Sequence, residues 1–357
     1  ALKKIDKNLY KEFFIRNNNE LLLKNNQTYI NKNILIPKNF TVKILPGQKI
    51  ILTDNAFIFS KSFWIADGSK NIIEIKGLKD NFGGGIFIND PLNKSLFSNI
   101  NFKYLGGLKK PFFYNTKKEY LTTISSYNDE INSYSENLNL NPDESILFNL
   151  NYNLMGSVNF FNSNVIIENS KFEKICSEDA LNIVSSKFKL RNISFNENCS
   201  DSIDIDFGDG EIFNSYFSNI GNDALDFSGS SINLKKITLN NVGDKFISVG
   251  EESIVDIDNV KGENSFVGIV SKDGSTVTMK NIFLKNTIIG MAAYIKKNEY
   301  REGKIFAKNL NLINSRIISL TDNLSEIFIN NKKTKNKNEN IIDVIYKKDL
   351  SLIKEKS

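Results

Sequence analysis

Residues 200–250 read SDSIDIDFGDGEIFNSYFSNIGNDALDFSGSSINLKKITLNNVGDKFISVG. Three short apolar runs in this stretch begin 22 residues apart: Ile203-Asp204-Ile205, Leu225-Asp226-Phe227 and Ile247-Ser248-Val249. The same spacing continues on both sides, with runs that begin at Leu181, Ile269 and Met291. A fixed period of this length is typical of repeat architectures, in which each unit stacks on the one before it.

Each run is predicted to be a short strand. Its first and third residues are mostly apolar and face one way, which is the alternation of a strand with one buried side. A second series keeps a constant Asn-to-Phe interval in Asn169–Phe172, Asn192–Phe195 and Asn214–Phe217, and Asn suits a bend because it tolerates left-handed backbone. Parallel strands about 4.8 Å apart satisfy their backbone groups with the coils above and below. The sequence therefore predicts an all-β fold, a single-stranded right-handed parallel β-helix (β-solenoid) with coils of about 22 residues.

The chain of 357 residues is expected to form one elongated body. We predict an N-terminal cap over residues 1–30, the β-helix over 31–330, and a C-terminal cap or tail over 331–357. The period disappears between about residues 109 and 150, which indicates a long insertion, either over the binding face or merely tolerated. Around Ile341 to Ile345 an apolar patch predicts a terminal cap strand. Cys176 and Cys199 lie 23 positions apart, which fits a bridge or two buried thiols, with thiols favoured.

Composition excludes several classes of function. Lys and Arg number 46 against 41 Asp and Glu, so the chain lacks the basic excess of a nucleic-acid binder, and the repeats show no basic stripe. No apolar run approaches the roughly 18 residues of a membrane span. Oligomeric state is not readable from the sequence.

Over residues 30–330 the chain resembles the pectin-lyase-like superfamily of right-handed parallel β-helices. Within it, four motifs on successive coils are similar to the ordered motif series of uncharacterised bacterial β-helix repeat proteins. They are Ser200-Asp201-Ser202-Ile203-Asp204, Gly221-Asn222-Asp223-Ala224-Leu225-Asp226, Gly243-Asp244-Lys245-Phe246-Ile247-Ser248-Val249-Gly250-Glu251 and Ser271-Lys272-Asp273-Gly274-Ser275. With this resemblance we expect an extracellular, periplasmic or cell-surface protein whose partner is an acidic polysaccharide or a surface glycan.

The series is also loosely similar to that of polygalacturonases, in which two acidic motifs precede a Gly-His-Gly and an Arg-Ile-Lys motif. That resemblance implies Asp201 and Asp223 as catalytic acids and Lys272 as a ligand of a substrate carboxylate. The chain departs from it because it has no histidine, Asn222 replaces one of the paired acids, and Val270-Ser271 precede Lys272. Without histidine, lyase chemistry is favoured over hydrolysis.

Two outward columns of polar residues follow from the alternation. Asp204 and Asp226 should lie about 4.8 Å apart on adjacent coils, with Asp206 about 7 Å from Asp204 along its strand. Such a patch must raise a pKa or bind a cation, because like charges on adjacent strands repel. Calcium accepts several carboxylate oxygens, so Asp204, Asp206 and Asp226 are the candidate calcium ligands, the alternative being solvated surface aspartates.

Lys272 is the candidate general base, since a lysine can abstract the proton beside a sugar carboxylate where no histidine is present. It shares a column with Asp206 three coils away, which places the two about 14 Å apart. The candidate substrate contacts are Asp244, Lys245, Glu251, Asp273 and Tyr294. Lys245 has an interstrand ion pair as its alternative role, and Phe246 and Tyr294 either stack on sugar rings or pack beneath the insertion.

Together these features favour a carbohydrate-active β-helix that acts on or binds an acidic polysaccharide, with a calcium-assisted polyuronate lyase as the leading hypothesis. One alternative is a non-catalytic glycan-binding, adhesion or structural module. A second alternative is a glycoside hydrolase of the polygalacturonase type that lacks the usual histidine.

Overall fold

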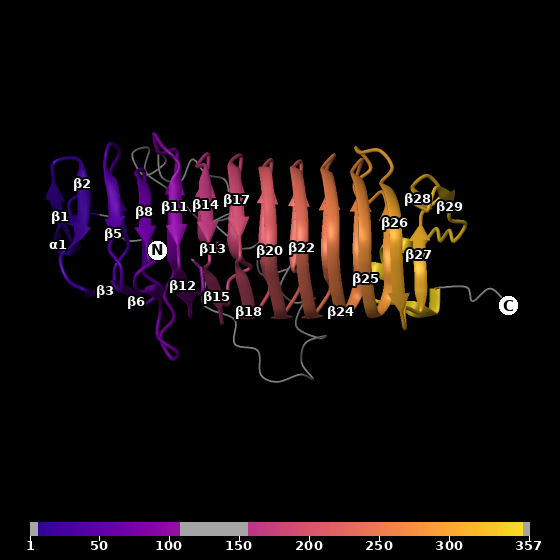
Figure 1. The fold of residues 1–357 in the computed structure, drawn as a ribbon, viewed down its shortest axis with the longest axis horizontal. Coiled ribbons are helices and arrows are strands. Elements are labelled where there is room, and N and C mark those ends of the chain that lie inside the picture. The colour runs from indigo at the N-terminus through magenta and orange to yellow at the C-terminus, as the bar shows by residue number, and fades with distance from the viewer. Residues whose placement is uncertain (1–5, 108–155, 353–357) are drawn as a thin grey trace, which may run out of the picture.

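The computed structural model describes residues 6–107 and 156–352 and shows the predicted right-handed parallel β-helix, with its strands stacked along one axis (Figure 1). It is all-β and has about 12 turns of roughly 22 residues. The insertion predicted at residues 109–150 lies outside the described residues. Away from the two ends, each strand of the β-helix pairs with strands one coil before and one coil after it, so the long axis is built from parallel ladders.

Each coil contributes to three faces. The first, here called the site face, contains β4 (Ile34–Ile36), β7 (Phe57–Ser60), β10 (Gly85–Asn89), β13 (Gly156–Phe161), β16 (Asp179–Val184), β19 (Asp201–Asp206), β21 (Leu225–Ser228), β23 (Lys245–Gly250), the C-terminal ends of β24 (Ile254–Lys272) and β25 (Thr276–Tyr294), and β27 (Ile317–Thr321).

The second face contains β2 (Glu20–Leu23), β5 (Thr41–Ile44), β8 (Phe63–Asp67), β11 (Ser95–Ser98), β14 (Val165–Glu168), β17 (Lys187–Arg191), the first parts of β20 (Asp209–Ile220), β22 (Ser231–Val242), β24, β25 and β26 (Lys304–Ile313), and β28 (Glu326–Ile329). The third contains β3 (Gln27–Ile30), β6 (Lys49–Leu52), β9 (Ile73–Lys76), β12 (Ile100–Lys103), β15 (Lys171–Glu173), β18 (Ser194–Asn198) and later parts of β20, β22, β24, β25 and β26.

The parallel pairing on the site face confirms the predicted register. Leu181, Ile203, Leu225, Ile247 and Ile269 follow one another as direct partners, one coil apart. All five are fully buried in the core. The alternating residues therefore point outward, which fixes the columns on which the site is built.

Like residues stack along the other faces as well. The rings of Phe102, Phe172, Phe195 and Phe217 form an interior ladder with centroid separations of 4.7, 4.4 and 5.1 Å. At the bend before it, Asn169, Asn192 and Asn214 have φ of 51°, 52° and 49°, as predicted for left-handed asparagines. Each of the last two donates a side-chain hydrogen bond to the asparagine one coil earlier.

The two ends of the β-helix are covered differently. At the N-terminal end, α1 (Tyr10–Phe13) leads into β1 (Phe14–Asn17), which pairs antiparallel with β2, and β2 already stacks in parallel on β5. After β28, the chain forms β29 (Lys332–Lys333), α4 (Ile341–Tyr346) and the 3-10 turn η2 (Leu350–Leu352). The strand predicted around Ile341 to Ile345 is wrong, because this segment is a short helix with Ile341, Val344 and Ile345 buried.

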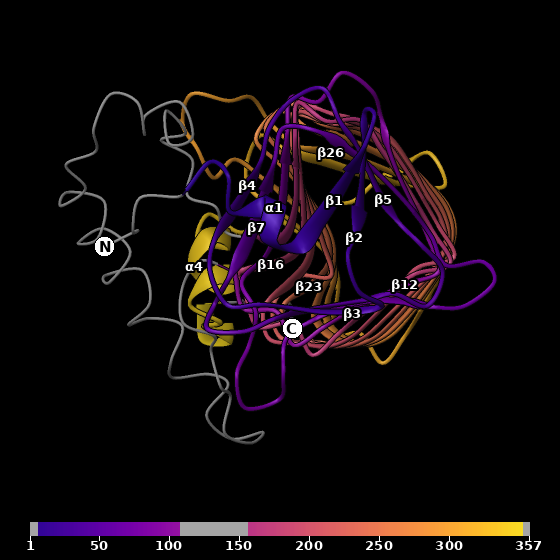
Figure 2. The ribbon, with the colours of Figure 1, turned by 90° about the vertical axis from the view of Figure 1, so that its left-hand side faces the viewer.

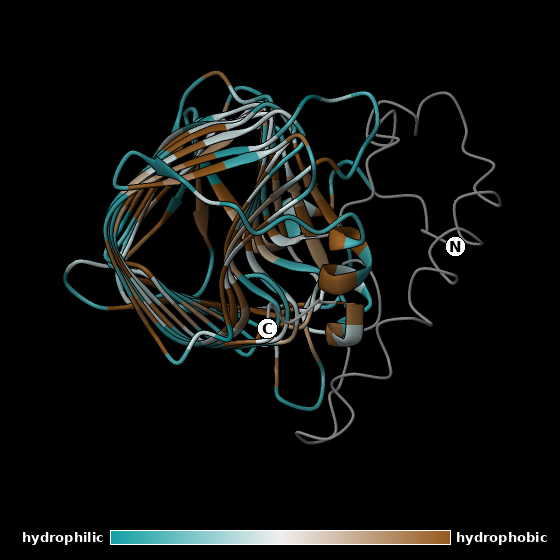
Figure 3. Cartoon of the chain, turned by 90° about the vertical axis from the view of Figure 1, so that its right-hand side faces the viewer, coloured by the Kyte–Doolittle hydropathy of each residue, from teal (hydrophilic) through white to brown (hydrophobic). Residues whose placement is uncertain are grey.

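The C-terminal segment returns to the outside of the site face. Figure 2 looks along the axis and shows α4 beside the face that carries β16 and β23. Figure 3 shows the same helix from the other end, with apolar residues on it. Within the described part of the chain, no helix is long and apolar enough to cross a membrane.

Cys176 and Cys199 are joined in a disulfide between adjacent coils, with their Cα atoms 4.7 Å apart. The preference for two free thiols is therefore wrong. Stacking of consecutive coils brings residues about one period apart into this range, so the two side chains meet without an extra loop.

Candidate functional site

Three outward columns of the site face carry the polar residues. The first column contains Asp179, Asp201, Asp223 and Lys245, the second Asn182, Asp204, Asp226 and Ser248, and the third Val184, Asp206, Ser228 and Gly250. Asp179 was not among the predicted site residues. Its position 22 residues before Asp201 is the signal that would have identified it.

The first column is a ladder of carboxylates that cap the next coil. Asp201 accepts a hydrogen bond from the backbone N–H of Asp223 at 2.8 Å, and Asp223 accepts one from the backbone N–H of Lys245 at 2.9 Å. The ammonium of Lys245 lies 3.4 and 3.3 Å from the two oxygens of Asp223 and also pairs with Asp244. Each of Asp223 and Lys245 is only 3% exposed, so this ion pair is part of the framework beneath the site.

Electrostatics in this column keep the buried pair ionised. Burial raises the pKa of Asp223 to about 6, although the charge of Lys245 opposes the shift. Burial disfavours the charge of Lys245, but Asp223 and Asp244 outweigh that effect and raise its pKa well above the usual value. At neutral pH both groups are therefore charged, as an interstrand ion pair requires.

The column position of Lys272 predicted that its side chain would lie three coils from Asp206. In the structure the side chain instead reaches back toward the acids. Its ammonium reaches back to donate a hydrogen bond to Ser248 Oγ at 2.9 Å and lies 3.8 Å from Asp226 Oδ1. Gly250 makes this path possible, because a Cβ there would lie 2.7 Å from Lys272 Cε. The missing side chain at Gly250 thus lets Lys272 cross to the second column.

Lys272 and Asp226 fix each other's charge. Burial opposes ionisation of Asp226, but the charges of Lys272 and Lys245, with a hydrogen bond from Ser248, lower its pKa below the usual value. In return Asp226 raises the pKa of Lys272 despite burial. A lysine held as a cation does not fit the predicted role of general base, which requires a neutral amine.

The remaining carboxyls are pushed toward their neutral form. Burial raises the pKa of Asp201 well above its usual value, and the charges of Asp223, Asp179 and Asp226 add to the effect. Burial and neighbouring aspartates do the same to Asp204 and, with Glu178, to Asp179. Asp201 and Asp226 are both partly exposed, so the site presents one carboxyl with a raised pKa beside one with a lowered pKa.

Within residues 6–107 and 156–352, one group of three carboxylates converges: Asp201, Asp223 and Asp226 each offer an oxygen within 4.8 Å of the others. Of the predicted calcium ligands, only Asp226 belongs to this cluster. Asp204 is Asp226's strand partner, and its carboxylate accepts a hydrogen bond from Asn182 at 3.3 Å. Asp206 lies in the third column, where the charges of Asp226 and Glu251 reach it.

The predicted substrate contacts are mostly engaged by the protein itself. Asp244 pairs with Lys245 and lies 3.7 Å from Lys348, and Glu251 pairs with Lys297. Asp273 is fully buried and accepts hydrogen bonds from the backbone N–H groups of Lys296 and Lys297 at 2.6 and 2.8 Å.

The two aromatic residues predicted to stack on sugar rings are not available for it. Phe246 is fully buried in the core. Tyr294 faces outward but is also fully buried, because α4 packs on it. Its hydroxyl is 3.0 Å from the hydroxyl of Tyr346, a residue that the sequence analysis did not select.

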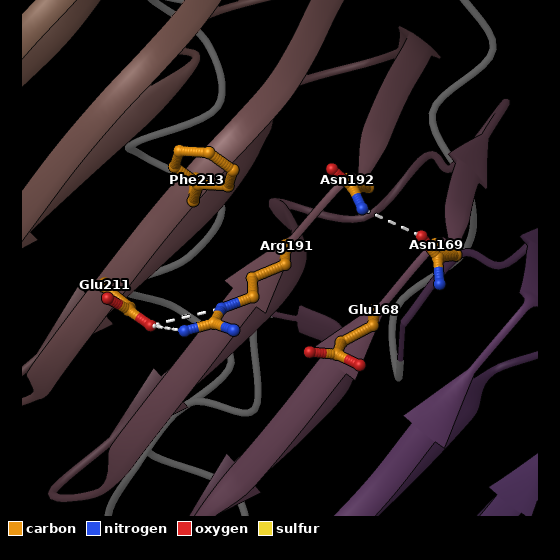
Figure 4. Close-up of a pocket in the computed structure, with 6 residues that line it drawn as sticks. All are labelled: Glu168, Asn169, Arg191, Asn192, Glu211 and Phe213. Atoms are coloured by element: carbon orange, nitrogen blue, oxygen red, sulfur yellow. Dashed lines mark hydrogen bonds and ion pairs between the residues drawn. The ribbon is translucent and has the colours of Figure 1, made fainter.

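A shallow pocket on the second face is separate from these columns (Figure 4). It is lined by Glu168, Asn169, Arg191, Asn192, Glu211 and Phe213. Arg191 pairs there with Glu211, and Asn192 donates to Asn169. Because four of its polar residues already pair with one another, we place the functional site on the acidic columns instead.

Acidification should stabilise the protein through the third column. Burial, with the charges of Asp226 and Glu251, raises the pKa of Asp206 from 3.8 to about 6. A carboxyl with a higher pKa in the folded state stabilises it below its unfolded pKa, and this contribution is lost as pH rises through about 6. As the pH rises from about 4 to 7, the melting temperature of Asp206→Asn should therefore increase relative to that of wild type.

The matched control is Asp209→Asn, an exposed aspartate at the start of β20. Its melting temperature should follow wild type across the same range. Parallel curves for Asp206→Asn and wild type would contradict the raised pKa.

No protein-family model and no curated protein matches the sequence. Among solved structures, the chain is similar to a double mutant of the periplasmic alginate epimerase AlgG, with 11% identity, 94% of this chain and 81% of that chain covered, and a TM-score of 0.44. It is also similar to the catalytic domain of a GH87 alpha-1,3-glucanase in complex with nigerose, with 11% identity, 86% and 64% covered, and a TM-score of 0.34. Similarity at this level does not assign an activity to the chain.

Proposed function

We propose that the protein is a carbohydrate-active β-helix that cleaves an acidic polysaccharide on its site face, with Asp201 as general acid and Asp226 as nucleophile. The observation that carries the proposal is the placement of these two partly exposed carboxylates, with oxygens within 4.8 Å of each other, in opposite electrostatic surroundings. Neighbouring carboxyls whose pKa values are driven apart are the arrangement that glycoside hydrolysis requires.

The acid and the nucleophile are prepared by different neighbours. Burial and the neighbouring carboxylates raise the pKa of Asp201 well above its usual value, which favours the protonated form that a general acid needs. Asp226 is kept ionised by Lys272 and Ser248. Lys245 binds both carboxylate oxygens of Asp223. The backbone N–H of Asp223 in turn donates a hydrogen bond to Asp201 and so positions it.

Cleavage then proceeds in two steps. Asp201 gives its proton to the glycosidic oxygen as the bond to the anomeric carbon breaks, and Asp226 attacks that carbon. Water then displaces Asp226 and returns a proton to Asp201. Their separation is nearer the about 5–5.5 Å of retaining enzymes than the larger gap of inverting ones, so we expect the product to retain its anomeric configuration.

Hydrolysis is preferred over the lyase reaction because the lyase needs a base near the sugar carboxylate. Lys272, the candidate for that base, is buried and its pKa is raised by Asp226. A permanently cationic lysine supports Asp226 as an ionised group instead.

The test is incubation of the protein with polygalacturonate, alginate and a neutral glucan. New reducing ends without unsaturated products support hydrolysis of the uronate polymers. Unsaturated products, seen by their ultraviolet absorbance, would support the lyase reaction, and binding without cleavage would support a non-catalytic glycan-binding module.

Calcium binding at the same cluster is a second candidate role, favoured by the convergence of Asp201, Asp223 and Asp226. Their oxygens are donors that calcium accepts, although Lys245 and Lys272 already contact two of them. We expect calcium at a hundredfold excess over its dissociation constant to add about 2.7 kcal/mol to the free energy of unfolding, reversed by chelator.

Two variants locate the calcium site. Asp201→Asn should abolish the rise in melting temperature if calcium occupies the converging cluster, while Asp206→Asn should leave it intact. The reverse result would place the ion at Asp204, Asp206 and Asp226, and a wild type without any response would remove calcium from the proposal.

We also propose that the protein acts outside the cytoplasm. The disulfide between Cys176 and Cys199 supports this, because such bonds persist in oxidising compartments.

A further inference from the structure

The outward residues of the site face change character abruptly after β23. Up to Gly250 the three columns present mainly carboxylates, Lys245 and Ser248. The next coil presents Val267, Val270 and Lys272, whose ammonium reaches back to Asp226, and the coil after it presents Ile289, Ala292 and Tyr294. Val267, Val270, Ile289, Ala292, Tyr294, Ile317 and Leu320 form a separate buried cluster on this outer surface. Because apolar side chains facing outward need cover, this part of the face requires another segment of the chain.

The C-terminal segment supplies that cover. Ile341, Val344 and Ile345 of α4 belong to the same buried cluster, so the helix lies on the outer surface of the coils that follow the acidic ones. Beyond the helix, Lys348 donates a hydrogen bond to the carbonyl of Gly243 at 3.4 Å and lies 3.7 Å from Asp244. The segment is thus attached on both the apolar coils and the last acidic coil.

This attachment places Tyr346 at the border of the acidic columns. Its hydroxyl is held by Tyr294, and its ring centre is 5.3 Å from the ammonium of Lys245, which contacts Asp223. Tyr346 as a whole remains 38% exposed. A partly exposed aromatic residue whose hydroxyl is fixed by a neighbour is suited to packing against a sugar.

An exposed cation accompanies this ring. The ammonium of Lys296 lies 4.6 Å from the ring centre of Tyr346, and the side chain is exposed. Within residues 6–107 and 156–352 no carboxylate lies in ion-pair distance of it, whereas its neighbour Lys297 is paired with Glu251. Among the described residues, Lys296 therefore has no ion-pair partner that a ligand carboxylate would have to displace.

We propose that α4 closes one end of the acidic face, and that the site holds the terminal uronate of a chain against Tyr346 with its carboxylate on Lys296. This rests on the proposed hydrolysis and specifies its substrate as a chain end. A polymer lying along the columns cannot continue past α4, because the helix occupies the outer surface of the next coils. Cleavage then starts from one end and releases products of one small size.

The experiment uses hexamers of galacturonate, mannuronate and guluronate, each with a fluorescent label at the reducing end. Wild type should release a single short product from the first time points. Tyr346→Ala should release products of several sizes, because the sugar chain can shift along the face once the Tyr346 side chain no longer stops its end. Lys296→Gln should raise KM about tenfold with kcat unchanged, the loss expected for a hydrogen bond to a charged group.

Matched controls are Tyr216→Ala and Lys235→Gln, two exposed residues away from the site face that should behave as wild type. Random internal cleavage by wild type, or an unchanged product pattern in Tyr346→Ala, would overturn the closed end while leaving hydrolysis in place. If the hexamers bind without being cleaved, the hydrolysis fails, and tenfold weaker binding by Lys296→Gln then supports the uronate site. Unchanged binding by that variant, or no binding by wild type, overturns it.

Discussion

Asp226→Asn is expected to lower kcat for the cleaved uronate polymer by a factor of about 10² to 10⁴, with KM little changed. The amide has nearly the same shape as the carboxylate, so the strand and its partners should stay in place. The amide cannot attack the anomeric carbon, and it lacks the negative charge that Lys272 stabilises on Asp226. The measurement is the initial rate of appearance of reducing ends.

Asp258→Asn is the control, because that aspartate pairs with Lys280 on the second face and is remote from the acidic columns. It should retain the full rate. If Asp226→Asn also cleaves at the wild-type rate, Asp226 is not the nucleophile and the proposed pair of carboxylates is rejected.

The second large effect concerns the core rather than the site. Leu225 is fully buried and stacks between Ile203 and Ile247 on the neighbouring coils. Leu225→Asp would place a charge where neither water nor a partner is available, so a loss of more than about 4 kcal/mol in the free energy of unfolding is expected. Denaturant unfolding followed by circular dichroism measures it.

Leu324→Asp provides the comparison, since Leu324 is 67% exposed and its replacement should be nearly neutral. Similar losses in both variants would show that the stacked column at Leu225 does not carry stability.

The coil architecture was predictable because one residue in each strand repeats its chemistry every 22 positions. Register, the inward column through Leu225 and the asparagine bends all follow from that period, and the structure confirms them. The structure of the C-terminal end could not be predicted in this way. The segment from Ile341 carries apolar residues that suit a strand as well as a helix, and the surface against which it packs decides between the two.

The columns of acids could also be placed from the sequence, but the reach of a long side chain could not. Column spacing predicted a distance of about 14 Å between Lys272 and Asp206. In the structure the flexible side chain of Lys272 passes over Gly250 and reaches Asp226. Tyr346 was missed for a different reason. Nothing near it in sequence points to the site, and only the apolar outward residues at Val270 and Ala292 indicate that some segment must return to cover them.

The number of coils between the acids and α4 also sets the distance between them. Insertion of one complete coil after Gly250 would preserve every ladder on either side of it, because each coil contacts only its neighbours. It would nevertheless move Tyr346 away from Asp226 by about 4.8 Å, a distance comparable to one sugar ring. On the proposed mechanism, gain or loss of a single repeat there would therefore change the length of the released product. It would also separate Lys272 from Asp226 and Lys348 from Asp244, so these two contacts would have to be rebuilt.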